Sequence, residues 1–294
     1  MTRQCSVVVI GNFDGVHAGH RQLMARAQAE APQLPLVAVT FWPHPVAVLR
    51  PDRAPQLLCS LPERIQLLRE AGARDVRVVE FTPRTAAWSP EHFVEFTLLP
   101  LRPKVVVAGE NFRFGRGATG TGQMLRELAA GRFQVISLPL VKDQEILSSS
   151  RVRDALEAGD VQQAAQVLGR PYRFSGIVVL GDQRGATIGF PTANLTVPPD
   201  RACPRDGVYA GWLTRLDTGQ RYPAAISVGT NPTFDGAQRR VETYVLDHDD
   251  LELYGVEVGI DFVERLRGQI RFDSVEALVE QMTNDVAQTR QVLA

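Results

Sequence analysis

Length, composition and charge exclude several classes of protein. A chain of 294 residues is long enough for two domains, because domains commonly run to about 100–200 residues. An apolar share of 44 % and a charged share of 22 % exclude disordered, collagen-like and coiled-coil chains. A net charge of −1 gives no overall reason to expect binding to nucleic acid or to a membrane.

The expected location is the cytoplasm. The opening residues hold only a short apolar run, so we expect no signal peptide. No stretch approaches the ~18 apolar residues of a membrane span. The three cysteines have no metal-ligand spacing and suit a reducing compartment.

From residue 6 to residue 138, short β-branched runs alternate with helical patterns. This alternation predicts βαβ units and a parallel sheet. Ser60 and Glu63 form a capping-box pattern that opens a helix, and Gly72 closes it. Ser89 before Pro90, and the segment from Thr121 to Gly131, indicate two further helices. The strands are expected at 7–10, 36–41, 76–81, 105–108 and 133–138.

After Gly169 the pattern changes to strands separated by glycine and proline, which predicts an antiparallel sheet or a small barrel. These strands are expected at 173–180, 193–197, 208–216, 224–228, 240–246 and 256–263. A last helix is predicted from helical spacing of apolar residues. Its apolar positions are Val275, Leu278, Val279, Met282, Val286 and Leu293. We place the domain boundary between residues 169 and 170, with the helical segment 155–170 ending the first domain.

The first segment with chemical character is 11–20, GNFDGVHAGH, which follows a predicted strand and opens a helix. Exposed N–H groups and the positive end of a helix dipole favour phosphate at such a place. His17 and His20 are three residues apart and share a helical face, so two imidazoles can donate hydrogen bonds to a phosphate. The alternative is a surface turn with two incidental histidines. A zinc site would need a third ligand nearby.

Segment 11–20 resembles the HxGH motif of nucleotidyltransferases and, more narrowly, the adenylyltransferase module of the prokaryotic riboflavin kinase/FAD synthetase family. Segments 40–45 (TFWPHP), 109–115 (GENFRFG) and 148–153 (SSSRVR) resemble later motifs of that module. The resemblance implies a Rossmann-like domain in which His17 and His20 contact the ATP phosphates. Catalytic Arg153 and Ser149 would hold the phosphates from the far side, and Asn111 would help to seat the substrates. The remaining ATP- or substrate-binding residues implied are Gly11, Asn12, Phe13, Asp14, Ser148 and Ser150.

Two features of this half have other interpretations. Segment 148–153 alone is also a helix N-cap, which is compatible with an anion clamp. Segment 115–120 matches G-x-G-x-x-G, but five residues separate it from its strand, so we interpret it as a glycine loop and not as a dinucleotide site.

The second segment with chemical character is 181–195, which is rich in glycine, hydroxyl and amide groups. A glycine loop can wrap phosphates with its amides. Thr192 and Asn194 are two apart on a strand-like stretch and point the same way, offering neutral oxygens to Mg²⁺. Glu242, on a later strand, is a candidate proton acceptor. An ordinary turn and a solvated glutamate are the structural alternatives.

Segment 189–195, GFPTANL, resembles the motif of the riboflavin kinase barrel, and segments 207–211, 229–234 and 253–255 resemble its later motifs. The resemblance implies that Thr192 and Asn194 ligate Mg²⁺–ATP and that Glu242 is the general base for the riboflavin 5′-hydroxyl. The segment from Arg267 to Phe272 and the last helix would border the flavin. The other binding residues implied are Gly181, Arg184, Gly189, Phe190 and Pro191. Ala186 and Tyr244 depart from the family pattern, as Ser150 does in the first half.

Together these resemblances imply an enzyme that phosphorylates riboflavin to FMN in its C-terminal domain and adenylylates FMN to FAD in its N-terminal domain. The expected cofactor is Mg²⁺ with ATP. Riboflavin, FMN and FAD are expected as substrates and products, not as prosthetic groups, and neither nucleic acid nor membrane as a partner. The alternatives are a nucleotidyltransferase for another phosphate acceptor and a non-catalytic flavin-binding or regulatory protein. The sequence does not decide the oligomeric state.

Overall fold

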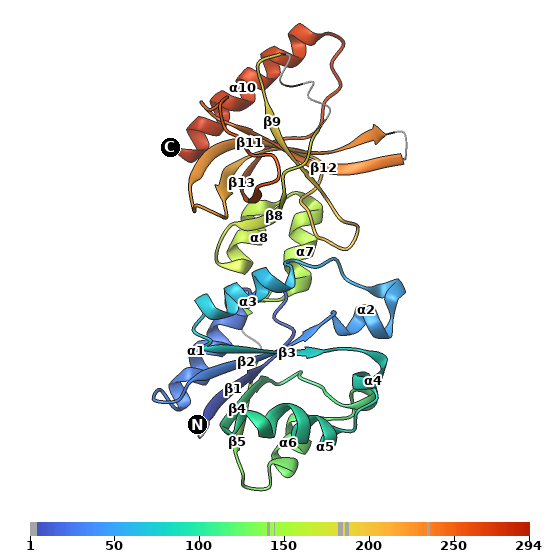
Figure 1. The fold of residues 1–294 in the computed structure, drawn as a ribbon, viewed down its shortest axis with the longest axis vertical. Helices are drawn as coiled ribbons and strands as arrows, with labels where there is room; N and C mark the ends of the chain where they lie inside the picture. The colour runs from blue at the N-terminus through green and yellow to red at the C-terminus, as the bar shows by residue number, and fades with distance from the viewer. Residues whose placement is uncertain (1–4, 140–141, 144, 182–184, 186–187, 234–235) are drawn as a thin grey trace. The chain divides into compact units, whose positions relative to one another are not determined.

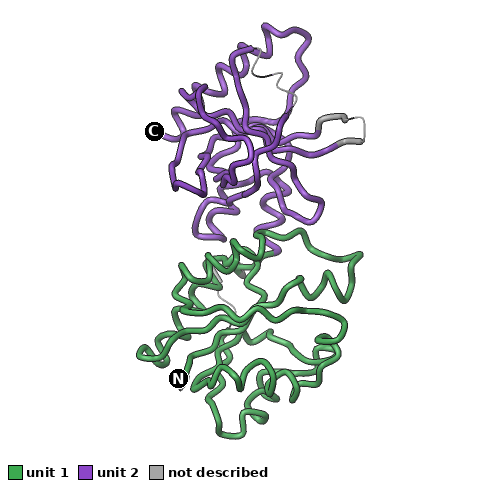
Figure 2. Tube along the Cα trace, in the orientation of Figure 1, with its two compact units in different colours: residues 1–149 green, residues 150–294 purple. Residues whose placement is uncertain are grey.

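The computed structural model describes residues 5–139, 142–143, 145–181, 185, 188–233 and 236–294. The chain divides into two compact units, Met1–Ser149 and Ser150–Ala294 (Figure 2). By packing, the helices expected to end the first domain therefore fall in the second unit. The functional boundary between residues 169 and 170 stays a prediction. In the described part of the chain, no helix combines the length and the apolar character that crossing a membrane requires.

The first unit is built on a five-stranded parallel sheet, which confirms the predicted fold class (Figure 1). The strand order is β3-β2-β1-β4-β5. The strands are β1 (Ser6–Ile10), β2 (Leu36–Trp42), β3 (Asp75–Glu80), β4 (Pro103–Gly109) and β5 (Gln134–Leu138). Strand order reverses at β1, and ligands of open parallel sheets bind outside the carboxyl ends of the strands at such a point.

Successive residues of a strand point to opposite faces of the sheet, so buried strands such as β1 carry apolar side chains on both faces. Helices cover both of these faces. One apolar cluster joins Val8 and Ile10 to α5 and α6, and the other joins Val7 and Val9 to α1 and α3. The helices are α1 (Ala18–Glu30), α2 (Pro45–Leu49), α3 (Leu61–Glu70), α4 (Pro83–Ala86), α5 (Pro90–Phe93) and α6 (Gly122–Ala129).

The predicted helix starts are confirmed. Ser60 and Glu63 form the reciprocal capping box of α3, and Gly72 follows that helix with φ +103°. Ser89 accepts a hydrogen bond from the His92 N–H at the start of α5, and Thr121 caps α6. After α5 the chain differs from a regular helix, because it continues as a π-helical turn over Val94–Leu98.

The second unit is a six-stranded antiparallel sheet, in the order β8-β13-β10-β11-β12-β9. The edge strands meet where the Val179 N–H donates to the Asn194 carbonyl at 2.9 Å, so the sheet curls into the predicted barrel. The strands are β8 (Tyr172–Ile177), β9 (Thr192–Thr196), β10 (Gly207–Arg215), β11 (Arg221–Thr233), β12 (Gly236–Val245) and β13 (Glu257–Arg267). Two helices, α7 (Ser149–Ala158) and α8 (Val161–Leu168), precede them, and α8 packs on β13 and β8.

The last helix, α10 (Val275–Leu293), packs on β10 and β11, as predicted. Val275, the first of the apolar positions that predicted this helix, is 56 % exposed and lies outside the core. The buried positions of α10 are Asp285 and Thr289. Arg267 donates from Nε and Nη2 to the Asp285 carboxylate at 2.9 and 2.6 Å, so an ion pair ties α10 to the end of β13.

Candidate functional site

The loop between β1 and α1 has an unusual backbone. Phe13, Gly15 and Val16 have φ angles of +52°, +76° and +40°. A positive φ is uncommon outside glycine and is rarest for β-branched residues such as valine. Such conformations persist only where the surroundings fix them, and they occur often at functional sites.

His17 and His20 lie together at the start of α1. His17 is the N-cap, and its Nδ1 accepts the His20 backbone N–H at 3.4 Å. The two rings stack with centroids 3.6 Å apart, and His20 also meets the Phe13 ring edge-on at 5.1 Å. A Cβ at Gly19 would lie 3.2 Å from the His17 ring, so this residue has to be small. Because Nδ1 of His17 is an acceptor, its proton belongs on Nε2.

The electrostatics keep His20 neutral. Burial lowers the pKa of His20 well below 6.5, and the neighbouring His17, Arg64 and Arg21 lower it further. Its Nδ1 is buried, with no hydrogen-bond partner among the described residues. A buried polar atom of this kind is costly unless something satisfies it. His20 is therefore suited to hydrogen bonding with a bound ligand rather than to acting as a fixed cation.

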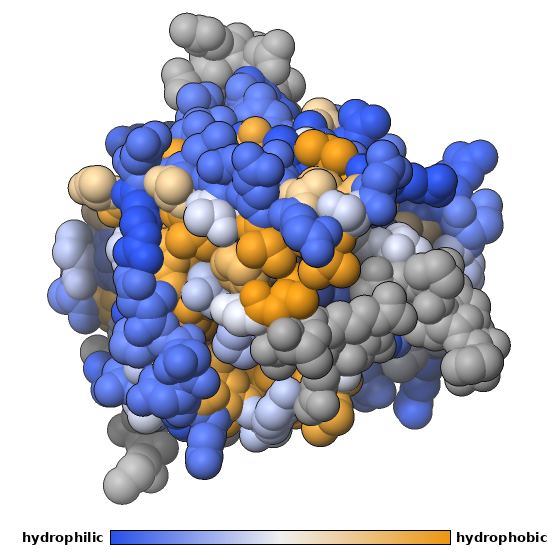
Figure 3. All heavy atoms as spheres, turned by 90° about the horizontal axis from the view of Figure 1, so that it is seen from above, coloured by the Kyte–Doolittle hydropathy of each residue, from blue (hydrophilic) through white to orange (hydrophobic). Residues whose placement is uncertain are grey.

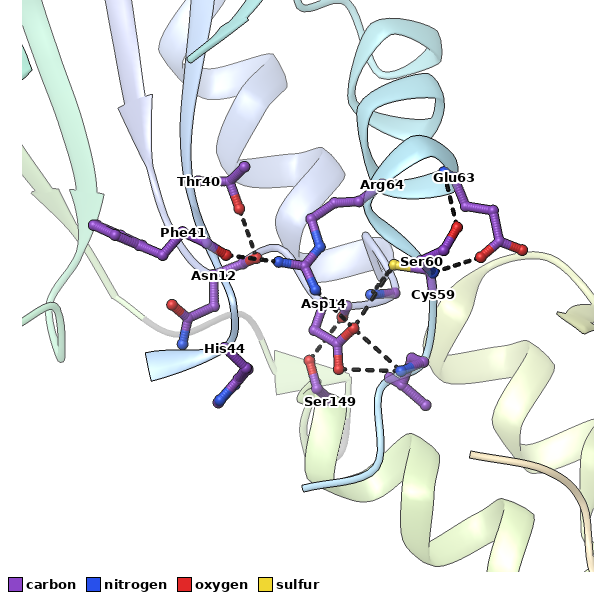
Figure 4. Close-up of polar contacts among 12 residues, drawn as sticks. Asn12, Asp14, Thr40, Phe41, His44, Cys59, Ser60, Glu63, Arg64 and Ser149 are labelled. Carbon is purple, nitrogen blue, oxygen red and sulfur yellow. Dashed lines mark hydrogen bonds and ion pairs between the residues drawn. The ribbon is translucent and has the colours of Figure 1, made fainter. Parts of the chain in front are cut away.

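A buried polar network supports the loop from inside (Figure 4). Asp14 is 1 % exposed; its Oδ1 accepts from Arg64 Nη2 at 3.2 Å, and both of its carboxylate oxygens accept from the Leu58 N–H. The Cys59 sulfur accepts the Gly15 N–H at 3.2 Å. Burial, then the Asp14 charge, raises the pKa of Cys59 to about 11, so it stays a thiol. Asp14, predicted to bind substrate, thus uses its carboxylate within the protein.

The other predicted residues of this half lie at the same edge of the sheet. The Gly11 N–H donates to the Val39 carbonyl, and the Asn12 carbonyl accepts from Thr40 Oγ1 at 2.9 Å. Asn111 is exposed in the turn after β4, the neighbour of β1.

A hydrogen bond from Ser149 links the start of α7 to the loop. Ser149 Oγ donates to the Asp14 carbonyl at 2.8 Å, although the two residues are 135 positions apart. Ser148 is half-buried and Ser150 exposed. Arg153 lies one turn further along α7, on the same helical face as Ser149, and belongs to the second compact unit.

In the second unit, strand register brings the predicted residues together. Glu242 on β12 pairs with Asn194 on β9, and Thr192 lies two residues further along the same strand face. Asn194 Nδ2 donates to the Thr192 carbonyl at 3.0 Å and to its Oγ1 at 3.2 Å. A Cβ at Gly181 would lie 2.5 Å from the Asn194 side chain, so only glycine fits beside the amide. Hydroxyl, amide and carboxylate oxygens thus face one region.

The turn before β9 carries the other predicted residues. Gly189 has φ +88°, and the Phe190 ring meets Tyr244 edge-on at 5.1 Å, with half-buried Pro191 following. Arg184 and Ala186 lie outside the described residues.

Large apolar side chains are exposed just before Gly181. Ile177 and Leu180 are 59 % and 68 % exposed. Separately from these two residues, Figure 3 shows a face of the molecule on which apolar side chains are grouped and bordered by polar ones. Contiguous exposed apolar surface is typical of ligand or partner sites.

The guanidinium of Arg267 makes its hydrogen bonds within the protein. Its guanidinium is held by Asp285, and its Nη1 donates to the Gly268 carbonyl at 3.0 Å. Two residues on, Gln269 Nε2 donates to Ser227 Oγ at 3.2 Å, and Ser227 pairs with Glu242 across β11 and β12. Arg267 therefore fixes the start of the segment predicted to border the flavin, and direct contact with the flavin stays a prediction.

Sequence reasoning gave no role to Arg64, Cys59 and Asp285, all of which are buried. One feature of the sequence could have indicated that Arg64 is buried. It is four residues from buried Leu68 and so lies on the same, buried face of α3. A charged residue on that face is unusual. Asp285 interrupts the apolar spacing of α10 in the same way, and Cys59 had no signal.

The chain is similar to proteins of one kind over almost its whole length. The family model for FAD synthetase matches residues 1–152, and the one for riboflavin kinase matches residues 168–293. The curated bifunctional riboflavin kinase/FMN adenylyltransferase of Listeria monocytogenes is 36 % identical, covering 98 % of this chain and 92 % of its own. That of Escherichia coli K12 is also 36 % identical, covering 97 % and 92 %. A crystal structure described as a macrolide-efflux protein from Streptococcus pneumoniae superimposes with a TM-score of 0.88 at 35 % identity, covering 99 % and 95 %.

Proposed function

The chain belongs to the family of bifunctional riboflavin kinase/FMN adenylyltransferases, and on that premise we propose which residues perform each reaction. The enzyme phosphorylates riboflavin to FMN with its C-terminal part and adenylylates FMN to FAD with its N-terminal part. We place the functional boundary between residues 169 and 170. With Cys5, Cys59 and Cys203 all unpaired, the cytoplasm is the proposed location.

In the adenylylation, a phosphate oxygen of FMN attacks the α-phosphorus of ATP, and the bond to pyrophosphate breaks. The stacked pair His17 and His20 is the observation that carries this assignment. The two imidazoles donate hydrogen bonds to the phosphates as charge builds in the transition state. Ser149 and Arg153 hold the phosphates from α7, with Ser148 and Ser150 beside them. The loop from Gly11 to Phe13, together with Asn111, seats the substrates.

In the phosphorylation, Glu242 accepts the proton of the riboflavin 5′-hydroxyl. The hydroxyl oxygen attacks the γ-phosphorus of ATP, and ADP leaves. The register that sets Glu242 opposite Asn194 is the observation that carries this assignment. Positioning and charge stabilisation supply most of the rate. Gly181, Gly189, Phe190 and Pro191 border the nucleotide, as does Arg184 from outside the described residues.

The oxygen donors of the second unit fit Mg²⁺. Asn194 uses its Nδ2 on Thr192, which leaves Oδ1 as the amide atom outside those bonds, and Thr192 adds a hydroxyl. Oxygen ligands, including neutral ones, suit this hard cation. Thr192 and Asn194 would hold it beside the ATP phosphates, where it would neutralise part of their charge.

The test is to incubate the full chain with riboflavin and Mg·ATP and to separate FMN and FAD by chromatography. His20→Ala is expected to lower FAD formation by about 10²–10³-fold, the loss for one transition-state donor, with FMN formation nearly intact. Glu242→Ala is expected to do the reverse, by about 10²–10⁴-fold for a general base. Equal loss of both products in each variant would contradict the division of roles. A yellow protein that never consumes ATP would support a non-catalytic flavin-binding protein.

A further inference from the structure

We propose that Arg64 is a positioning residue for adenylyl transfer: through Asp14 it holds the loop that carries His17 and His20. The inference rests on the proposed role of the two imidazoles. Arg64 is 0 % exposed, so its guanidinium acts through protein groups and not by touching a substrate.

The guanidinium joins three separate parts of the first unit (Figure 4). From α3, Nη2 donates to Asp14 Oδ1 and Nη1 donates to the Phe41 carbonyl, both at 3.2 Å. The guanidinium carbon lies 5.2 Å from the centre of the Trp42 ring. A planar fork makes both hydrogen bonds at once, whereas a lysine offers one compact charge. Arg64 therefore fixes the loop after β1 relative to the end of β2.

Burying this ion pair has a cost, which argues for a role beyond stability. Desolvation of two charges offsets much of their attraction, so apolar residues of similar size often stabilise a core equally well. Buried ion pairs are retained in some proteins because they fix one geometry. Here the geometry is that of a loop with positive φ at Phe13 and Val16, which needs external support.

Asp14 transmits this support to the imidazoles. It lies between Phe13 and Gly15, and its carbonyl also accepts from Ser149 Oγ. Three residues on, His17 caps α1 and stacks on His20. A shift of Asp14 therefore moves the N-cap and the ring pair together.

The first experiment compares Arg64→Met and Arg64→Lys in the full chain. Turnover of FMN to FAD is expected to fall on the order of 10- to 100-fold in Arg64→Met, as for a catalytic group misplaced by about 1 Å. Arg64→Lys keeps Asp14 paired and the fold intact, and we expect a smaller loss of several-fold because it cannot make both bonds. Riboflavin phosphorylation reports folding of the other unit, and hydrogen exchange of β1 reports folding of this one. Arg69→Met, an exposed arginine on the same helix, is the matched control and should retain FAD formation.

The second experiment separates positioning from a merely structural role. If Arg64 acts through the imidazoles, Arg64→Met has little further effect on turnover in a His20→Ala background. The same fold loss in both backgrounds overturns the inference, as does normal FAD formation in Arg64→Lys. A large loss in His20→Ala with unchanged Arg64→Met overturns this inference alone. Unchanged FAD formation in His20→Ala overturns the role of the imidazoles and, with it, this inference.

Discussion

The two candidate sites owe their geometry to different parts of the structure. In the first unit, buried side chains from distant segments hold an irregular loop, with Arg64 and Ser149 respectively 50 and 135 residues from Asp14. In the second unit, Glu242 and Asn194 face each other because two strands pair backbone to backbone. A site held by side chains is sensitive to single polar substitutions, whereas a site held by a strand ladder is sensitive to whatever displaces the strands.

The largest expected effect concerns the framework of the second site. Asp285→Ala leaves the half-buried guanidinium of Arg267 without its carboxylate. Breaking a fully buried pair costs about 3–5 kcal/mol, so we expect a loss near the lower end of that range. Hydrogen exchange of the β10 amides should report a less stable second unit. Glu280→Ala, at an exposed position of α10, is the control. Equal destabilisation by both variants would show that the ion pair contributes nothing specific.

The next effect directly tests the strand-built site, which consists of Thr192, Asn194 and Glu242 in the second unit. Gly181→Ala brings a methyl group against the Asn194 side chain, 2.5 Å from its nearest atoms, and must displace it. We expect FMN formation to fall on the order of 10- to 100-fold by misplacement, with FAD formation from added FMN unchanged. Gly219→Ala adds a Cβ with no atom within 4 Å, and its φ of +75° strains only that turn, so it controls for a general loss of stability in this unit. Normal kinase activity in Gly181→Ala would show that riboflavin phosphorylation does not depend on the position of the Asn194 amide.

A smaller effect is expected for one hydrogen bond of the loop-built site, which is the loop after β1 with His17 and His20. Ser149→Ala removes the donor to the Asp14 carbonyl. A net loss of about 0.5–1.5 kcal/mol per hydrogen bond corresponds to roughly a 2- to 12-fold fall in FAD formation. Ser149→Thr keeps the hydroxyl and should restore the rate. If both variants behave alike, the hydroxyl is not what holds the loop.

The smallest effect is a pH dependence of stability in the first unit. The pKa of His20 lies well below 6.5 when folded, so on acidification the unfolded chain binds a proton before the folded one does. The free energy of unfolding therefore rises with pH between the folded pKa and about 6.5, and this group contributes no slope outside that window. His20→Gln should remove that slope, measured as β1 amide protection between about pH 5 and 8, the range of histidine titration. His248→Gln, partly exposed beyond β12, is the control, and a slope unchanged in His20→Gln would contradict the assignment.

The strand-built site was the easier one to predict from sequence. Alternation along a strand puts Thr192 and Asn194 on one face, and the later strand carrying Glu242 has the same period. Local patterns also predicted the parallel sheet and the caps at Ser60 and Thr121, because these depend on neighbours within four residues.

Local sequence patterns could not predict the buried side-chain network around Asp14 in the first unit. Nothing near Arg64 indicates that its partner is Asp14, because only the packing of α3 against the sheet brings them together. The buried Asp285 and the exposed Val275 have the same origin, since the barrel and not the apolar spacing decides which face of α10 is covered. Local sequence likewise predicts α7 and α8 as helices but not the unit against which they pack.

The hydrogen bond from the Val179 N–H to the Asn194 carbonyl gives one residue two tasks. The backbone of Asn194 closes the barrel between its edge strands, β8 and β9, while its side chain donates a hydrogen bond to Thr192. A proposed magnesium ligand is thus carried by the residue whose backbone closes the barrel. Tight binding of a nucleotide beside Asn194 should therefore also stabilise the contact between the two edge strands.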